Sequence, residues 1–125
     1  KIFDNIMGFP HKMETLLGER GVNLSGGQKQ RLSIARALIR EPKLLLFDDC
    51  LSAVDTETEE AILENIDKNS KERTNIIVSH RISSIRNANH ILVIENGSII
   101  EQGSHKYLLS LKGFYSKMYE QQLND

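Results

Sequence analysis

The sequence predicts an α/β fold with a largely parallel sheet, and two features carry this prediction. The short continuous apolar run 43–48 is typical of a strand buried on both faces, and segment 74–79 is predicted to be a second buried strand. Segments with apolar residues at helical spacing alternate with these runs, which is the order of elements in α/β proteins. A chain of 125 residues is long enough for one small domain with a core and too short for two.

Two helices are expected around the first apolar run. Ser25 can act as the N-cap of a helix whose apolar residues recur at helical spacing until Pro42 ends it. Thr56 and Glu59 form a capping box, which predicts a second helix running to about Asn69.

The C-terminal third is predicted to hold a hairpin and a helical tail. Segments 90–95 and 98–101 read as strands joined by Asn96-Gly97, the strongest short signal for a β-hairpin. The tail from Gly103 onward is predicted to be helical, with an apolar stripe that serves as core or docking surface.

Composition excludes several classes of function. Hydrophobic residues make up 39% of the chain and charged residues 26%, which is ordinary for a soluble globular protein. A net charge of -1 predicts no broad attraction to nucleic acid or anionic lipid. The single Cys50 excludes an internal disulfide and is interpreted as a small buried residue. No apolar run approaches the roughly 20 residues that span a bilayer.

The segment Leu24-Ser25-Gly26-Gly27-Gln28 can bind an anion. Two glycines behind a serine at a helix start allow backbone N–H groups to approach a ligand closely, and the helix dipole favours negative charge there. The serine hydroxyl adds a donor. The alternative is a plain loop with an N-cap.

Acidic and imidazole side chains follow the two predicted strands. Asp48-Asp49 ends the first strand, at the edge where α/β folds bind ligands. One carboxylate can hold Mg²⁺ and the other can polarise an attacking water. His80 follows the second strand, ahead of a short helix expected around 82–87, and in a parallel sheet it would face the same edge. The alternatives are solvated loop acids and a structural histidine.

Four segments, in order and spacing, resemble the motifs of ABC ATPases. They are similar to the signature motif, the Walker B strand, the D-loop and the switch-histidine loop. The matching residues are Leu24-Ser25-Gly26-Gly27-Gln28-Lys29-Gln30-Arg31 with Ala35-Arg36-Ala37-Leu38, then Lys43 to Asp48, then Ser52-Ala53-Val54-Asp55, and then Ser79-His80-Arg81.

This resemblance implies a P-loop NTPase-like ABC ATPase domain, of which 1–125 is the C-terminal part. Residues 1–42 would end the helical subdomain and carry the signature, and 43–125 would belong to the catalytic core. No G-x-x-x-x-G-K-[ST] segment occurs, so the phosphate-cradling loop is expected ahead of residue 1. Without that loop, and with an exposed sheet edge, the fragment is expected neither to hold a nucleotide nor to be stable alone.

The resemblance also implies a head-to-tail dimer of two such domains with ATP between them. Ser25, Gly26, Gly27 and Gln28 would contact the γ-phosphate of nucleotide held mainly by the partner domain. Asp55 would cross the dimer interface and couple the two sites.

The chain's own site would use the residues that follow the strands. Asp48 would serve Mg²⁺, and His80 would contact the γ-phosphate and hold the attacking water. Asp49 stands where most family members carry the glutamate taken as general base. Aspartate is one methylene shorter, about 1.5 Å of reach, so slow hydrolysis is predicted. With an intact signature, this indicates one half of a heterodimeric exporter; the alternative is a homodimer with an aspartate base.

The segment Gly18-Glu19-Arg20-Gly21 resembles the part of ABC exporters that touches the coupling helices of the membrane domain. Glu19 and Arg20 therefore favour an exporter, at the cytoplasmic face of the plasma or inner membrane. One rival is a DNA-maintenance ATPase, but 1–23 carries no heptads and the charge gives no basic footprint for nucleic acid. Another is a non-catalytic cassette subunit.

Overall fold

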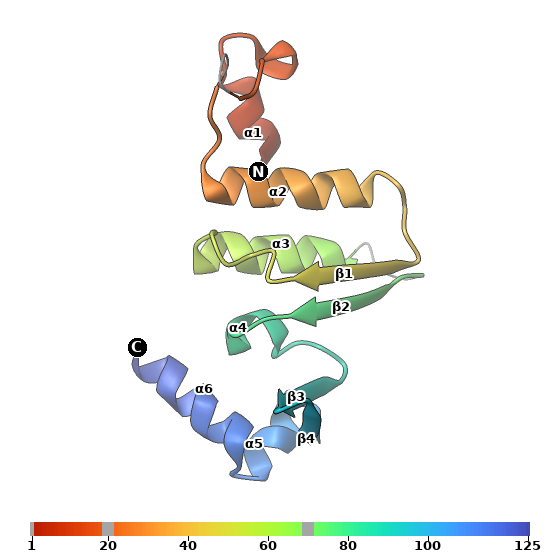
Figure 1. The fold of residues 1–125 in the computed structure, drawn as a ribbon, viewed down its shortest axis with the longest axis vertical. Helices are drawn as coiled ribbons and strands as arrows, with labels where there is room; N and C mark the ends of the chain where they lie inside the picture. Colours follow the sequence, from red (N-terminus) through yellow and green to blue (C-terminus); the bar gives the residue numbers. More distant parts are fainter. Residues whose placement is uncertain (1, 19–21, 69–71) are drawn as a thin grey trace. The chain divides into compact units, whose positions relative to one another are not determined.

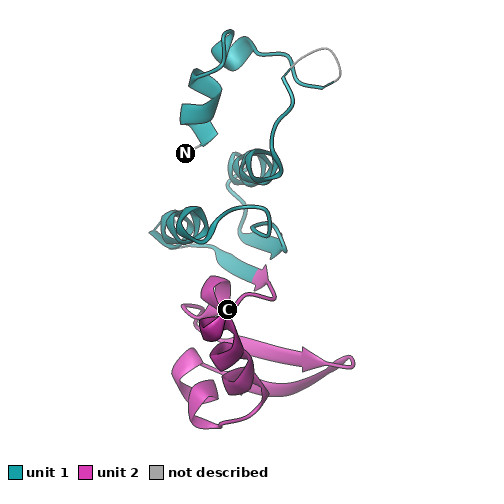
Figure 2. Cartoon of the chain, turned by 90° about the vertical axis from the view of Figure 1, so that its left-hand side faces the viewer, with its two compact units in different colours: residues 1–76 teal, residues 77–125 magenta. Residues whose placement is uncertain are grey.

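A computed structural model describes residues 2–18, 22–68 and 72–125 (Figure 1). The chain divides into two compact units, Lys1–Ile76 and Ile77–Asp125, each described by itself (Figure 2). The elements are, in chain order, α1 (Ile2–Met7), the 3-10 helix η1 (Lys12–Glu14), α2 (Gly26–Leu38), β1 (Leu44–Asp48), α3 (Thr56–Lys68), β2 (Thr74–Val78), α4 (Ile82–Ile85), β3 (Ile91–Glu95), β4 (Ser98–Gly103), α5 (His105–Ser110) and α6 (Phe114–Asn124).

Strands β1 and β2 pair and run in the same direction, as predicted (Figure 1). Along β1 the burial alternates: Leu45 and Phe47 are 5% and 2% exposed, whereas Leu44 and Leu46 are 58% and 59% exposed. The prediction of a strand buried on both faces is therefore wrong for this chain. Leu44 and Leu46 on the second face are in contact with solvent.

Helices α2 and α3 begin with different caps. Ser25 caps α2, as predicted, and its side chain forms a reciprocal capping box with Gln28. The predicted capping box of α3 is wrong, because Thr56 is already the first helical residue and Glu59 is buried. Asp55 has the N-cap position instead: its Oδ1 accepts a hydrogen bond from the backbone N–H of Thr58. The aspartate stands one residue earlier and is an equally good cap.

In the second unit, β3 and β4 form the predicted antiparallel hairpin. Asn96 and Gly97 both have positive φ, 50° and 77°, which the tight turn requires. The hairpin is a two-stranded sheet separate from β1 and β2. Among the described residues the chain therefore holds one parallel pair and one antiparallel pair, and not a single largely parallel sheet.

The helical tail is two helices, because Lys112 takes a left-handed conformation (φ 51°) between α5 and α6. Leu108 and Tyr115 of the predicted apolar stripe are 0% and 1% exposed and join the core of this unit. The hydroxyl of Tyr115 lies 2.7 Å from Nδ1 of His105. Burial, and next the charge of Tyr119, raises the pKa of Tyr115.

Candidate functional site

The start of α2 presents hydrogen-bond donors to solvent. The Ser25 Oγ accepts from the Gln28 N–H (3.2 Å), and the Gln28 Oε1 accepts from the Ser25 N–H (3.0 Å). Because the Ser25 hydroxyl oxygen is the acceptor in this cap, its proton can still be donated outward. The N–H groups of Gly26 and Gly27 belong to the first turn, where a helix of 13 residues leaves backbone donors without helical partners.

Both glycines also lie against the loop that follows β1. A Cβ on Gly26 would stand 3.3 Å from the Cβ of Ala53, and a Cβ on Gly27 would stand 3.0 Å from the Ala53 carbonyl oxygen. The sequence predicts these glycines from the close approach of an anion to the helix start. The structure adds a second reason, since glycine at both positions lets the helix start approach the D-loop-like segment 52–55.

Gln30, one turn into α2, connects the helix to the same loop. Its Nε2 donates to the Ser52 Oγ (3.0 Å) and its Oε1 accepts from the Ala53 N–H (2.9 Å). The Ser52 hydroxyl in turn donates to the Asp49 carbonyl oxygen (3.2 Å). We call these three hydrogen bonds the Gln30 bridge. Gln30 has no predicted role of its own, because no local sequence pattern marks a contact between residues 22 positions apart.

Asp48 and Asp49 are both exposed at the end of β1. Asp49 has a left-handed backbone (φ 53°), a conformation that aspartate tolerates better than most residues. Its neighbour Cys50 is half-buried, with Sγ 3.6 Å from the Asp48 carbonyl oxygen. The loop therefore holds the candidate base in a defined and uncommon conformation.

Asp48 and Asp49 could bind Mg²⁺ only together with further ligands. Among the described residues, no group of three or more histidine, cysteine or acidic side chains could hold a metal ion. Mg²⁺ is commonly bound through one or two carboxylates together with substrate phosphates and water. The exposed Asp48 carboxylate suits that role, and phosphate oxygens would supply the remainder.

Asp55 is engaged within its own chain. Its Oδ1 accepts from the Thr58 N–H (2.9 Å), and its Oδ2 accepts from the Thr58 hydroxyl (2.8 Å). The carboxylate is exposed nonetheless. The structure thus gives Asp55 a helix-capping role, and its role across a dimer interface stays a prediction.

His80 lies in the second unit, and its loop is attached to α6. The Gln122 Nε2 donates to the His80 carbonyl oxygen (2.7 Å), and the Gln122 Oε1 accepts from the Ile82 N–H (2.8 Å). We call this pair the Gln122 bridge. The Ser79 Oγ accepts from the Arg81 N–H (3.0 Å). The exposed His80 side chain therefore stands on a backbone that is held on both sides.

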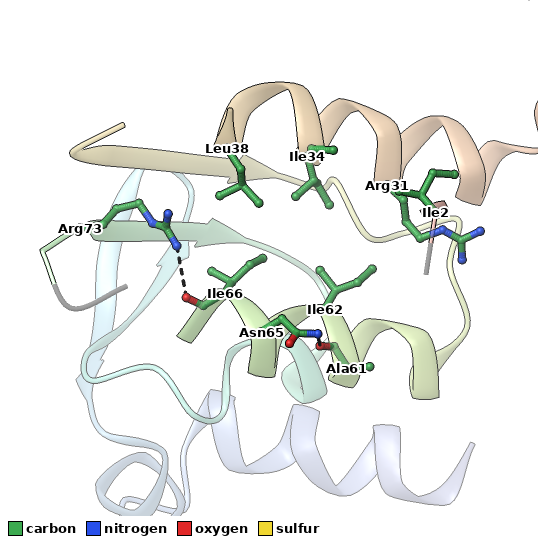
Figure 3. Close-up of a pocket in the computed structure, with 10 residues that line it drawn as sticks. Ile2, Arg31, Ile34, Leu38, Ala61, Ile62, Asn65, Ile66 and Arg73 are labelled. Atoms are coloured by element: carbon green, nitrogen blue, oxygen red, sulfur yellow. Dashed lines mark hydrogen bonds between the residues drawn. The ribbon is translucent and has the colours of Figure 1, made fainter. Parts of the chain in front are cut away.

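A cavity of about 210 Å³ lies apart from these residues, between α2 and α3. Figure 3 shows Ile34 and Leu38 of α2 pointing toward Ile62 and Ile66 of α3. Its remaining lining residues are Ile2, Arg31, Ala35, Ala61, Asn65 and Arg73. No predicted site residue lines it.

The predicted coupling residues Glu19 and Arg20 lie outside the described residues. Within the described part of the chain, no helix is both long enough and apolar enough to cross a bilayer.

Comparison with known proteins agrees with the motifs. The family model described as ABC transporter matches residues 3–52. The chain is 52% identical over 119 residues, 95% of its length, to the multidrug resistance protein 1 of Entamoeba histolytica, of which it covers 9%. It is 53% identical over 114 residues, 91% of its length, to the ATP-dependent lipid A-core flippase of Pasteurella multocida, of which it covers 20%.

A solved structure gives the same result. The structure of a bacterial Atm1-family ABC exporter with ATP bound matches 95% of this chain and 21% of its own, with a TM-score of 0.89 and 45% identity. The resemblance to ABC exporters is thereby confirmed, and the fold is that of part of an ABC ATPase domain. The chain spans between 9% and 21% of the length of these proteins.

Proposed function

We propose that this chain is the C-terminal part of the nucleotide-binding domain of an ABC exporter, in which binding and hydrolysis of ATP drive export across a membrane. The observation that carries the proposal is the start of α2, where the Ser25 hydroxyl and the backbone N–H groups of the first turn can donate to a phosphate. The names and titles of the similar proteins support the same class.

In this proposal the signature residues serve a nucleotide bound by a second domain. The Ser25 hydroxyl and the N–H groups of Gly26 and Gly27 would donate to the γ-phosphate, and the Gln28 side chain would fix the serine through the capping box. Preorganised donors of this kind stabilise charge that develops on a transferring phosphoryl group. Asp55 would contact the partner domain while it caps α3.

The chain's own site would use Asp48, Asp49 and His80. Mg²⁺, when bound with ATP, neutralises phosphate charge, and the Asp48 carboxylate would hold it. Asp49 would accept a proton from the attacking water, and the His80 imidazole would orient that water and the γ-phosphate. Asp49 is shorter than glutamate, so this site would hydrolyse slowly, which supports a heterodimer whose other site is fast.

The partners follow from the same class. A membrane domain would contact the segment that contains Glu19 and Arg20 through its coupling helices, and the ATPase domain would lie at the cytoplasmic face of the membrane. We expect no nucleic-acid partner, because the net charge of -1 gives no electrostatic footprint for one.

Ser25→Asp in the complete transporter, assembled with its partner, tests this function. Aspartate is as good an N-cap as serine, so α2 stays folded, but its charge repels the γ-phosphate. We expect ATP hydrolysis to fall by about 100-fold or more, while thermal stability changes little. Ser25→Thr, which keeps the hydroxyl, is the control. Full ATPase activity in the Ser25→Asp protein would refute the assignment.

A further inference from the structure

The Gln30 bridge has a consequence for catalysis that reaches beyond the contacts of the signature itself. Gln30 lies on α2, whose first turn would serve a nucleotide bound by the partner domain. Its amide bonds end on Ser52 and Ala53, in the loop that also carries Asp49 of the chain's own site. One side chain therefore connects the elements that belong to two different ATP sites.

The assignment of the amide atoms follows from the chemistry of the partners. The Ala53 N–H is a donor only, so the oxygen of the Gln30 amide must face it. The nitrogen then faces the Ser52 Oγ and donates to it. A serine oxygen that accepts this bond directs its own proton elsewhere, and here that proton goes to the Asp49 carbonyl oxygen. The bridge thus has one direction, from Gln30 through Ser52 to Asp49.

The residue at the end of the bridge needs support. Asp49 has φ 53°, a backbone conformation that costs free energy for any residue with a side chain. A bond to its carbonyl oxygen helps to keep that conformation. The backbone that carries the Asp49 carboxylate is thereby held beyond the end of β1.

We propose that Gln30 is a positioning residue for Asp49, and that through Ser52 it links the placement of the signature helix to the placement of the general base in the same chain. This rests on the proposed function. When α2 moves against a nucleotide in one site, the Gln30 bridge moves the loop after β1 in the other. Gly26 and Gly27 support the link, because their lack of side chains keeps the helix start against Ala53.

The test uses the complete transporter with its partner and three variants. Gln30→Ala removes both amide bonds. Gln30→Glu keeps an acceptor for the Ala53 N–H but turns the Ser52 hydroxyl toward the new carboxylate and away from Asp49. Ser52→Ala breaks only the second half of the bridge. Ser33→Ala removes an exposed hydroxyl from the same helix and is the matched control.

The first readout is hydrogen exchange of the peptide that contains Ala53, which requires no ATP. We expect exchange about three- to tenfold faster in Gln30→Ala, since one hydrogen bond is lost, and near the native rate in Gln30→Glu. The second readout is steady-state ATP hydrolysis at the site built on Asp49. We expect kcat to fall about 10- to 100-fold in all three variants, with KM for ATP within about threefold of the native value.

The outcomes separate the two proposals. If kcat stays at the native value in Gln30→Ala, the positioning role is overturned, whether hydrogen exchange stays native or becomes faster. If kcat falls in Gln30→Ala but not in Gln30→Glu or in Ser52→Ala, the link through Ser52 is overturned. A native transporter that neither binds nor hydrolyses ATP overturns the proposed function, whatever the exchange data show.

Discussion

Two loops of this molecule are held by a glutamine amide, and the two glutamines come from helices of different kinds. Gln30, which holds the loop of Asp49, lies on the helix that also carries the signature. Gln122, which holds the loop of His80, lies on α6, where no site residue is predicted. The first loop is therefore attached to another functional element, whereas the second is attached to the core of its own unit. A change in α2 should alter the communication between sites, and a change in α6 should alter only the local placement of His80.

Gln122→Ala is expected to have the largest effect on ATP hydrolysis among the changes that distinguish the two loops. It removes a donor to the His80 carbonyl oxygen and an acceptor for the Ile82 N–H, so the loop is free to shift. We expect kcat of the complete transporter to fall by about 10- to 100-fold, with little change in KM for ATP. Gln121→Ala, which removes the same amide from an exposed neighbour on α6, is the control. Equal activities in the two variants would show that the Gln122 bridge has no catalytic role.

Gly27→Ala tests the contact between the start of α2 and the loop that follows β1. The new Cβ would stand 3.0 Å from the Ala53 carbonyl oxygen, so helix and loop must separate by a few tenths of an ångström. We expect about a tenfold loss of ATPase activity. Alanine favours the helix by up to about 1 kcal/mol, so thermal stability should not fall. A variant that loses stability in proportion to activity would indicate a packing role alone.

Asp55 distinguishes helix capping from contact with a partner. Asp55→Ala should cost about 1 kcal/mol of unfolding free energy, because the cap on Thr58 is lost. Asp55→Ser restores the cap but not the carboxylate. If Asp55 also contacts the partner domain, the serine variant regains stability in a denaturant titration and still hydrolyses ATP slowly. Recovery of both properties would restrict Asp55 to capping.

Tyr115 gives the smallest effect, and it is confined to the second unit. Its pKa is raised in the folded chain, so the stability that it contributes is present below about pH 10 and is lost as the pH rises further. Tyr115→Phe should cost about 1 kcal/mol at pH 8, because the bond to His105 is lost, and should show a smaller alkaline loss than the native chain. Urea titrations at pH 8 and 11, with the exposed Tyr107→Phe as control, measure both effects.

Local features of this chain could be predicted from the sequence, and long-range ones could not. The Ser25 cap and the Asn96-Gly97 turn depend on residues a few positions apart, and both predictions are confirmed. A capping box at Thr56 and Glu59 also fits the sequence, and only the structure shows that Asp55 caps α3 instead.

The two glutamine bridges lie beyond any sequence pattern of this kind. Gln30 contacts residues 22 and 23 positions away, and Gln122 contacts residues 40 and 42 positions away. Such contacts depend on how helices pack against loops, and glutamine carries no periodic signal that marks them. The exposure of Leu44 and Leu46 has a similar cause, since a continuous apolar run does not show which of its faces will be covered.

The most direct test of the account is the steady-state ATPase rate of the complete transporter chain, purified alone, against its Asp49→Asn and Asp49→Glu variants. We predict a folded chain that binds ATP but turns over slowly, with faster turnover in Asp49→Glu. A lone chain that hydrolyses ATP rapidly, and that loses this activity in Asp49→Asn without gaining any in Asp49→Glu, would contradict the slow-site proposal and establish a working homodimer.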